Sequence, residues 1–219
     1  MSTVVVDCEA VLFDMDGTLV DSRELVERMW LRWADEHGLP HDAILAVAHG
    51  RRTLETMQLV APEIATPEEA ERLDALEARE EGGETAVPGA RALIEALPPH
   101  RWAVVTSAVR DIAIRRVAAV GLPVPAVLVG AEDVAAGKPH PEGYLQAARR
   151  LGVDPRRTVI IEDTDAGVKA ARAAGARVIG LRTTYPTLAG CDIVVNDLRA
   201  LRAETQPGGG VILVVTADP

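Results

Sequence analysis

Residues 10–21 read AVLFDMDGTLVD, and this stretch decides the fold. The four apolar residues 10–13 predict a short, buried strand of a parallel sheet. The strand stops at Asp14 and Asp16, whose side chains point the same way on an extended backbone, and Gly17 permits a tight turn. Open α/β sheets place their chemistry at the carboxyl ends of their strands. We therefore expect two carboxylates to face one reacting centre here.

The two aspartates can divide the labour of a group-transfer reaction. A divalent cation beside them would lower the pKa of Asp14 and keep it an anionic nucleophile, while Asp16 could carry the proton. The alternatives are a surface turn and a calcium loop. A calcium loop of the EF-hand kind needs further oxygen ligands at alternate positions, whereas Leu19 and Val20 follow here. The pattern therefore favours catalysis.

Composition limits the possible partners. The chain has 219 residues, 48% of them hydrophobic and 26% charged, so it can bury an α/β core and add a small accessory domain. Its net charge of -10 argues against nucleic acid or an anionic membrane as a partner, because no basic stripe is available. An aromatic content of 3% offers no stacking platform for a nucleobase. The sequence has no apolar run of about 18 residues and no signal peptide, which predicts a cytoplasmic protein.

A helical segment follows the first strand. No strand-like run lies within residues 19–86, and apolar residues recur there at helical spacing. Ser22 and Thr66 are the expected N-caps of two of these helices. The glycines of EGGETAVPG, residues 81–89, predict a hinge where the chain returns. The predicted helices cover residues 22 to 38, 42 to 48, a segment that ends near 60, and 67 to 81.

From residue 88 onward, strands and helices alternate. Strands separated by helices of about ten residues predict a doubly wound parallel sheet with right-handed crossovers. The last apolar run, residues 211–215, predicts a further edge strand. The expected strands are 102–106, 126–130, 158–162, 176–181 and 192–195, and the expected helices are 90–97, 111–119, 141–151 and 166–174.

Candidate catalytic residues lie in two loops of this alternating pattern, one after a predicted strand and one before a predicted helix. Thr106 and Ser107 end a strand, where hydroxyl and backbone N–H groups suit a phosphoryl oxygen but also suit a helix cap. Lys138, in GKPHP, is one of only two lysines, and Lys169 is expected on the surface. A compact ammonium group can contact both a carboxylate nucleophile and an incoming phosphoryl group. Lys138 is therefore a candidate catalytic residue.

Adjacent acids end the strand TVIIE. Glu162 and Asp163 would repel each other without a cation, and carboxylate oxygens suit Mg²⁺. The alternative is that these acids cap the next helix, which is the role we expect for Asp165. The sequence therefore predicts a metal site beside the two aspartates of the first strand.

Four segments, DMDGT, TS, GKPHP and EDTDAG, follow one another in this order. Together they resemble the four motifs of the haloacid dehalogenase superfamily, and the second aspartate of DMDGT is typical of its phosphoryl-transfer branch. The resemblance spans nearly the whole chain. It implies a Rossmann-like core of residues 1–20 and 88–219, with a small all-helical cap domain, residues 21–87, inserted after the first strand.

The resemblance also assigns roles to single residues. It implies that Asp14 becomes a covalent aspartyl-phosphate and that Asp16 is the general acid/base. It implies a Mg²⁺ site made by the Asp14 carboxylate, the Asp16 backbone carbonyl and Asp163, with Glu162 a ligand directly or through water. The implied phosphate-binding residues are Met15, Asp16, Thr106, Ser107 and Lys138.

The cap is expected to choose the substrate. The stretch HGRRT resembles that of small sugar-phosphate and glycerol-phosphate phosphatases, so His49, Arg51 and Arg52 are candidate substrate contacts, although a solvated helix start would look the same. Related phosphosugar mutases, such as β-phosphoglucomutase, carry a cap histidine where this chain has Val26. Phosphonate hydrolysis needs a cap lysine, and this cap has none.

The prediction is therefore a Mg²⁺-dependent phosphomonoesterase that acts on a small sugar or polyol phosphate. The alternatives are a phosphosugar mutase and, from another class, a non-catalytic phosphate-sensing regulator on the same fold. Loss of Asp16 or Lys138 would be typical of such a regulator, and both are present. We expect a monomer or a weak dimer.

Overall fold

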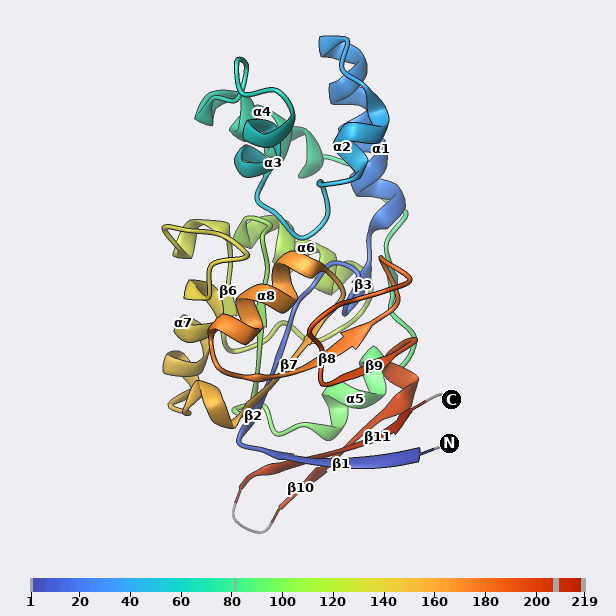
Figure 1. The fold of residues 1–219 in the computed structure, drawn as a ribbon, viewed down its shortest axis with the longest axis vertical. Coiled ribbons are helices and arrows are strands. Elements are labelled where there is room, and N and C mark those ends of the chain that lie inside the picture. The colour runs from blue at the N-terminus through green and yellow to red at the C-terminus, as the bar shows by residue number, and fades with distance from the viewer. Residues whose placement is uncertain (1, 81, 207–208, 218–219) are drawn as a thin grey trace.

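The computed structural model describes residues 2–80, 82–206 and 209–217. Its centre is a six-stranded parallel sheet in the order β6-β5-β2-β7-β8-β9 (Figure 1). The predicted doubly wound sheet is thus confirmed, and the strand at residues 10–13 lies inside it between β5 and β7. The strands are β2 (Ala10–Phe13), β5 (Trp102–Val105), β6 (Leu128–Val129), β7 (Thr158–Glu162), β8 (Arg177–Leu181) and β9 (Ile193–Val195).

Both faces of this sheet are covered, which explains why its strands are apolar without alternation. Val11 and Phe13 of β2 belong to one buried cluster, and Leu12 between them belongs to another on the opposite face. Successive side chains of a strand point to opposite faces, so each face has its own core. The helices of this layered core are α5 (Ala90–Ala96), α6 (Arg110–Ala119), α7 (Glu142–Leu151) and α8 (Asp165–Ala173).

Four further helices stand above the carboxyl end of the sheet, and we call residues 23–77 the cap (Figure 1). The cap has a hydrophobic cluster of its own, in which Leu25, Trp33 and Met57 are fully buried. Thr66 accepts the expected capping hydrogen bond from the backbone of Glu69 (3.2 Å). The helices are α1 (Arg23–His37), α2 (His41–Leu45), α3 (Thr53–Val60) and α4 (Pro67–Glu77), so the last ends earlier than predicted.

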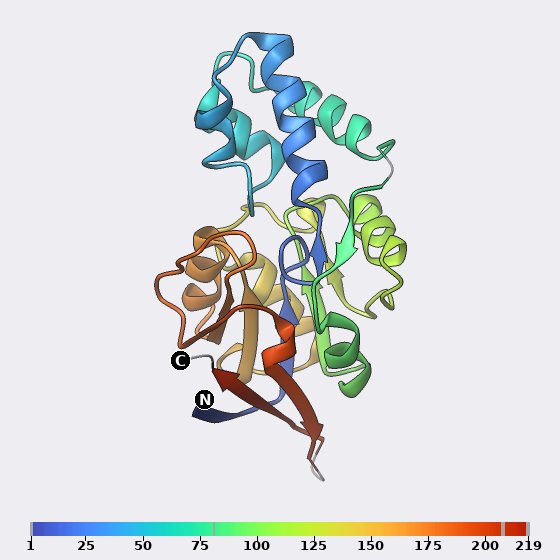
Figure 2. The same cartoon turned by 90° about the vertical axis from the view of Figure 1, so that its right-hand side faces the viewer.

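Two strands of two residues each join the cap to the core. β3 (Val20–Asp21) and β4 (Thr85–Ala86) pair antiparallel, and Figure 2 shows the outgoing and returning segments side by side. The prediction that no strand lies in this region was wrong, because two-residue strands are too short to show a periodicity. Glu81, which begins the predicted hinge, lies outside the described residues.

A separate antiparallel sheet lies at the opposite end from the cap (Figure 1). The run 211–215 was predicted as a further edge strand, but it belongs to β11, the middle strand of this sheet, which pairs antiparallel with β1 and β10. The buried side chains of β11 belong to the same hydrophobic cluster as Val11 and Phe13 of β2. Pro207 and Gly208, which precede β11, lie outside the described residues. The strands are β1 (Ser2–Cys8), β10 (Leu201–Thr205) and β11 (Val211–Ala217).

No helix within the described ranges is long and apolar enough to cross a membrane.

Candidate active site

The candidate site residues meet at the carboxyl edge of the main sheet. Parallel pairing aligns the ends of β2 and β7, and the Asp14 backbone N–H donates to the carbonyl of Ile161 (3.0 Å). Asp14 therefore lies beside Glu162 and Asp163, and carboxylate oxygens of the three lie within 4.8 Å of one another. All three residues are buried, and Asp14 is only 3% exposed. The register of the sheet thus concentrates negative charge at one point.

Lys138 supplies the cation of this cluster. Its Nζ donates to Asp14 Oδ1 (2.5 Å) and to Glu162 Oε1 (2.6 Å). Burial lowers the pKa of Lys138, but the two carboxylates outweigh burial and hold the pKa above its ordinary value. The ammonium group therefore stays charged against the Asp14 carboxylate.

Glu162 is saturated with hydrogen bonds. Besides the Lys138 bond, its Oε1 accepts from the Tyr144 hydroxyl (2.8 Å), and its Oε2 accepts from the backbone N–H groups of Asp163 (2.9 Å) and Thr164 (3.0 Å) and from the Thr164 hydroxyl (3.1 Å). Gly167 makes room for this carboxylate, since a Cβ there would lie 1.6 Å from Oε1. Glu162 thus fixes Lys138 against the start of α8.

The two oxygens of the buried Asp163 carboxylate have different surroundings. Its Oδ1 accepts from the Thr18 hydroxyl (3.1 Å), whereas Oδ2 is buried without a hydrogen-bond partner among the described residues. Gly17, at φ +76°, keeps this space open, because a Cβ there would lie 2.0 Å from Oδ2. Burial, together with the charges of Asp14 and Glu162, raises the pKa of Asp163 well above its ordinary value.

The charges of this cluster fit a bound divalent metal. Burial raises the pKa of Asp14 to about 7, and Lys138 opposes the rise while Glu162 adds to it. Three buried carboxylates face one ammonium group, so a second cation would complete the balance of charge. The orphaned oxygen of Asp163 and the hard carboxylate donors are those that a divalent cation such as Mg²⁺ or Ca²⁺ prefers.

Asp16 lies outside the group of three carboxylates and has different partners. Its Oδ1 accepts from the Ser22 hydroxyl (2.6 Å) and from Arg116 Nη1 (2.6 Å). Ser22 was predicted to cap α1, and it does precede the helix, but its hydroxyl binds Asp16 instead. The cap of α8 also differs from the prediction: Thr164, not Asp165, accepts from the Gly167 N–H (3.2 Å).

Thr106 and Ser107 lie where β5 ends. Thr106 is buried, and its hydroxyl accepts a hydrogen bond from the Ala108 N–H (3.1 Å). Ser107 donates to the Gly50 carbonyl of the cap (3.0 Å). Met15, directly after the first aspartate, is fully buried, and its carbonyl closes the turn by accepting from the N–H groups of residues 18, 19 and 20.

The cap arginines and histidine separate into two places. His49 and Arg51 line a cavity between cap and core, together with Asp14 and Asp16. Burial lowers the pKa of His49, although Glu27, at 3.4 Å, opposes the shift. The cavity lies directly over the carboxylates, where a substrate would have to sit to meet them.

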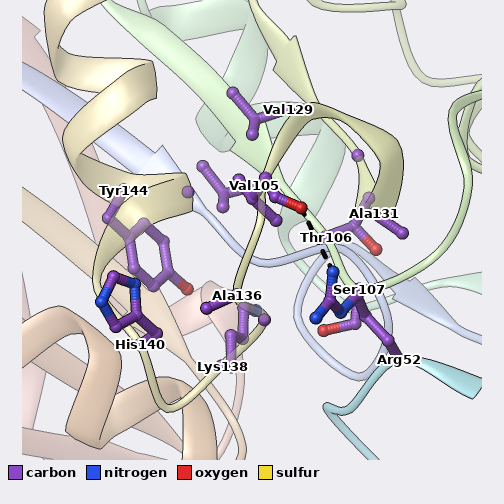
Figure 3. Close-up of a pocket in the computed structure, with 14 residues that line it drawn as sticks. Arg52, Val105, Thr106, Ser107, Val129, Ala131, Ala136, Lys138, His140 and Tyr144 are labelled. Atoms are coloured by element: carbon purple, nitrogen blue, oxygen red, sulfur yellow. Dashed lines mark hydrogen bonds between the residues drawn. The ribbon is translucent and has the colours of Figure 1, made fainter. Parts of the chain in front are cut away.

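Arg52 instead binds the core. It pairs with Glu55 and donates to the backbone carbonyls of Val134 and Ala135 (both 3.2 Å). Figure 3 shows it on the opposite side of a second, smaller pocket from Tyr144, with Lys138 between them in this view. Arg52 therefore fastens the cap to the loop that carries Lys138, and it does not line the larger cavity.

Sequence reasoning missed three residues of this region, namely Arg116, Glu77 and Tyr144. Arg116 of α6 reaches Asp16 and also pairs with Glu77, the last residue of α4. Arg116 and Glu77 stand in charged helices and belong to no motif, so they look like solvated surface residues in the sequence. Tyr144 is one of two tyrosines and likewise carries no pattern.

Glu77 gives a testable pH dependence. Burial raises its pKa from 4.5 to about 7, despite the charge of Arg116. Between these values the native state binds more protons than the unfolded state, so the free energy of unfolding falls as pH rises, by up to about 1.4 kcal/mol per pH unit. Glu77→Gln is expected to flatten this part of the profile. Urea unfolding in EDTA from pH 4.5 to 7.5 measures it, and Glu71→Gln, an exposed acid of the same helix, should keep the wild-type slope.

The fold and site define a class: a capped α/β enzyme with a buried aspartate–lysine pair and clustered carboxylates at the ends of parallel strands. The chain belongs to the haloacid dehalogenase-like hydrolases, because the model of that family matches residues 8–175. The predicted superfamily is therefore confirmed.

Curated relatives and solved structures agree with this membership. Hexitol phosphatase A of Escherichia coli (strain K12) is 41% identical over 213 residues, which cover 94% of this chain and 99% of the relative. Glycerol-1-phosphate phosphohydrolase 2 of Saccharomyces cerevisiae is 36% identical and covers 88% of this chain and 84% of the relative. A hydrolase from Pseudomonas syringae superposes with a TM-score of 0.76 at 29% identity and covers 86% of this chain and 94% of that structure.

Proposed function

We propose that the protein is a Mg²⁺-dependent phosphomonoester hydrolase that acts on a small sugar or polyol phosphate. The observation that carries the proposal is the buried Asp14 carboxylate, held by Lys138 at 2.5 Å beside two further acids. The likeness to a hexitol phosphatase and a glycerol-1-phosphate phosphohydrolase supports the reaction and the class of substrate.

Asp14, Asp163 and the backbone carbonyl of Asp16 would hold the Mg²⁺ ion. Glu162 was expected to serve as a ligand directly or through water, but its five hydrogen bonds favour the task of holding Lys138. When bound, the ion supplies positive charge that stabilises the phosphoryl group during transfer.

Asp14 is the nucleophile in this proposal. A carboxylate oxygen forms a bond to phosphorus while the bond from phosphorus to the sugar oxygen breaks, and Asp16 gives that oxygen its proton. Asp16 then takes a proton from the water that hydrolyses the aspartyl-phosphate. Lys138, Thr106, Ser107 and the backbone N–H groups around Met15 and Asp16 stabilise the phosphoryl oxygens.

The cavity beneath the cap selects the sugar or polyol part. His49 and Arg51 line it and can donate hydrogen bonds to substrate hydroxyls. Val26 also lines this cavity, at the position where the related mutases carry a cap histidine. Its side chain has no imidazole group, which favours a phosphatase over a mutase. We further propose that residues 21–87 form the cap domain on a core of residues 1–20 and 88–219, and that the protein acts in the cytoplasm as a monomer or weak dimer.

The proposed function predicts selective, metal-dependent phosphate release. Glycerol, hexitol, hexose, pentose, glycolate and nucleotide monophosphates are each incubated with the protein and Mg²⁺. Release is expected from sugar or polyol phosphates, and excess EDTA should abolish it, because the three carboxylates would then lack their second cation. Movement of phosphate between positions of a hexose bisphosphate, without release, would support the mutase instead. Binding of phosphate without turnover would support the regulator.

A further inference from the structure

Arg116 is a buried arginine between the core and the cap. Helix α6 carries it, and the residue is only 2% exposed. A buried guanidinium group destabilises a protein unless carboxylates pair with it. Two carboxylates do so here: Nη1 donates to Asp16 Oδ1 (2.6 Å), and Nη2 pairs with Glu77 Oε1. Arg116 also lines the cavity over the candidate site.

The two partners come from different parts of the molecule. Asp16 follows strand β2 of the core, whereas Glu77 is the last residue of α4 in the cap. Arg116 therefore connects the cap to Asp16 through two adjacent ion pairs. Ser22, directly before the first cap helix, donates to the same Oδ1 of Asp16 (2.6 Å). Both groups that hold Asp16 thus lie where cap and core meet.

The two donors share one oxygen of Asp16. The side chain of Asp16 keeps 27% exposure, and no hydrogen bond to Oδ2 occurs among the described residues. Oδ1 is therefore the anchored oxygen, and Oδ2 is the one left to exchange a proton with a substrate oxygen or a water. The planar fork of arginine can bind two carboxylates at fixed angles, which an ammonium group cannot do.

We propose that Arg116 is a positioning residue for Asp16, and that Glu77 of the cap holds Arg116 in place for this task. The proposal rests on the proposed function, in which Asp16 is the general acid/base. Arg116 lies outside the four sequence motifs, yet in this proposal it affects proton transfer by Asp16. The size of that effect depends on the position of the cap, because Glu77 of the cap holds Arg116.

The test compares two leaving groups. An alkyl phosphate such as a hexitol phosphate leaves as a strongly basic alkoxide and needs a proton, whereas p-nitrophenyl phosphate leaves as a stable phenolate. Arg116→Met is expected to lower kcat/KM by about 100-fold for the alkyl ester and by less than about 10-fold for the aryl ester, because only the first depends on a well-placed acid. Glu77→Gln should lower kcat/KM for the two esters in the same order, but by smaller factors than Arg116→Met.

Arg115→Met is the matched control. Arg115 stands next to Arg116 and also joins α6 to the cap, but it donates to the backbone carbonyls of Glu77 (3.0 Å) and Glu80 (2.8 Å) rather than to Asp16. It should change kcat/KM for both esters by the same factor. If Arg116→Met does not fold, Arg116→Lys and Ser22→Ala decide, since each weakens the hold on Oδ1 and should show the same selective loss.

Equal losses for the two esters, or no loss, would overturn the proposal. Such a result leaves the proposed function intact as long as the wild-type protein hydrolyses both esters. A wild-type protein that hydrolyses neither ester would overturn the proposed function itself, so the two failures are distinct.

Discussion

Replacing Asp14 by Asn is expected to reduce phosphate release by at least about 10⁴-fold, because an amide oxygen does not act as the nucleophile of this reaction. The variant should fold, since the amide oxygen can still accept the hydrogen bond from Lys138 Nζ that the carboxylate accepts at 2.5 Å. Phosphate release with the best substrate of the panel, far-UV circular dichroism and urea unfolding measure the two expectations.

Asp165→Asn is the matched control for this experiment. Asp165 is an exposed acid at the start of α8, two residues from Asp163, and it makes none of the contacts of the carboxylate cluster. Its variant should keep wild-type turnover. Normal turnover in Asp14→Asn would show that another group attacks phosphorus, and the mechanism would then have to be abandoned.

Lys138→Met is expected to remove activity and to lower the free energy of unfolding by about 3–5 kcal/mol at pH 8 in EDTA. The variant would leave the carboxylates of Asp14 and Glu162 buried without their cation. The loss of stability should shrink as pH falls from 8 to 5, because protons then neutralise the buried acids, and the pKa of Asp14 is already raised to about 7. Urea unfolding at several pH values measures both effects.

The chain supplies its own control, since its only other lysine is exposed. Lys169→Met removes the same charge from α8 and should leave stability nearly unchanged. A Lys138→Met variant as stable as Lys169→Met at pH 8 would contradict the role of Lys138 as the partner of the two buried acids.

The parts of the fold that local patterns describe were predictable. Each strand of the main sheet is a short apolar run, and the register that aligns β2 with β7 follows once both runs join one parallel sheet. Asp14, Glu162 and Asp163 could therefore be placed at one edge from sequence alone, and the structure brings carboxylate oxygens of the three within 4.8 Å of one another.

Contacts between distant segments were not predictable. Arg116 meets Asp16 across 100 positions of sequence, and a charged helix does not reveal which of its arginines turns inward. The prediction for Ser22 failed for a similar reason. Its local pattern fits an N-cap, but the nearby Asp16 carboxylate accepts the hydrogen bond from its hydroxyl instead. Strands β3 and β4, with two residues each, carry no local signal at all.

The pairing of β1 with β11 has a consequence for the order of folding. Residues 2–8 find their partner strand only after residues 211–217 have been synthesised, so this sheet closes a loop of about 200 residues. A nascent chain can assemble β2, β5 and β7 before that closure. During this time β1 remains unpaired, because its partner β11 has not yet been synthesised. We therefore expect refolding to show a slow late phase that reports on the terminal sheet, because contacts of such long sequence separation form last.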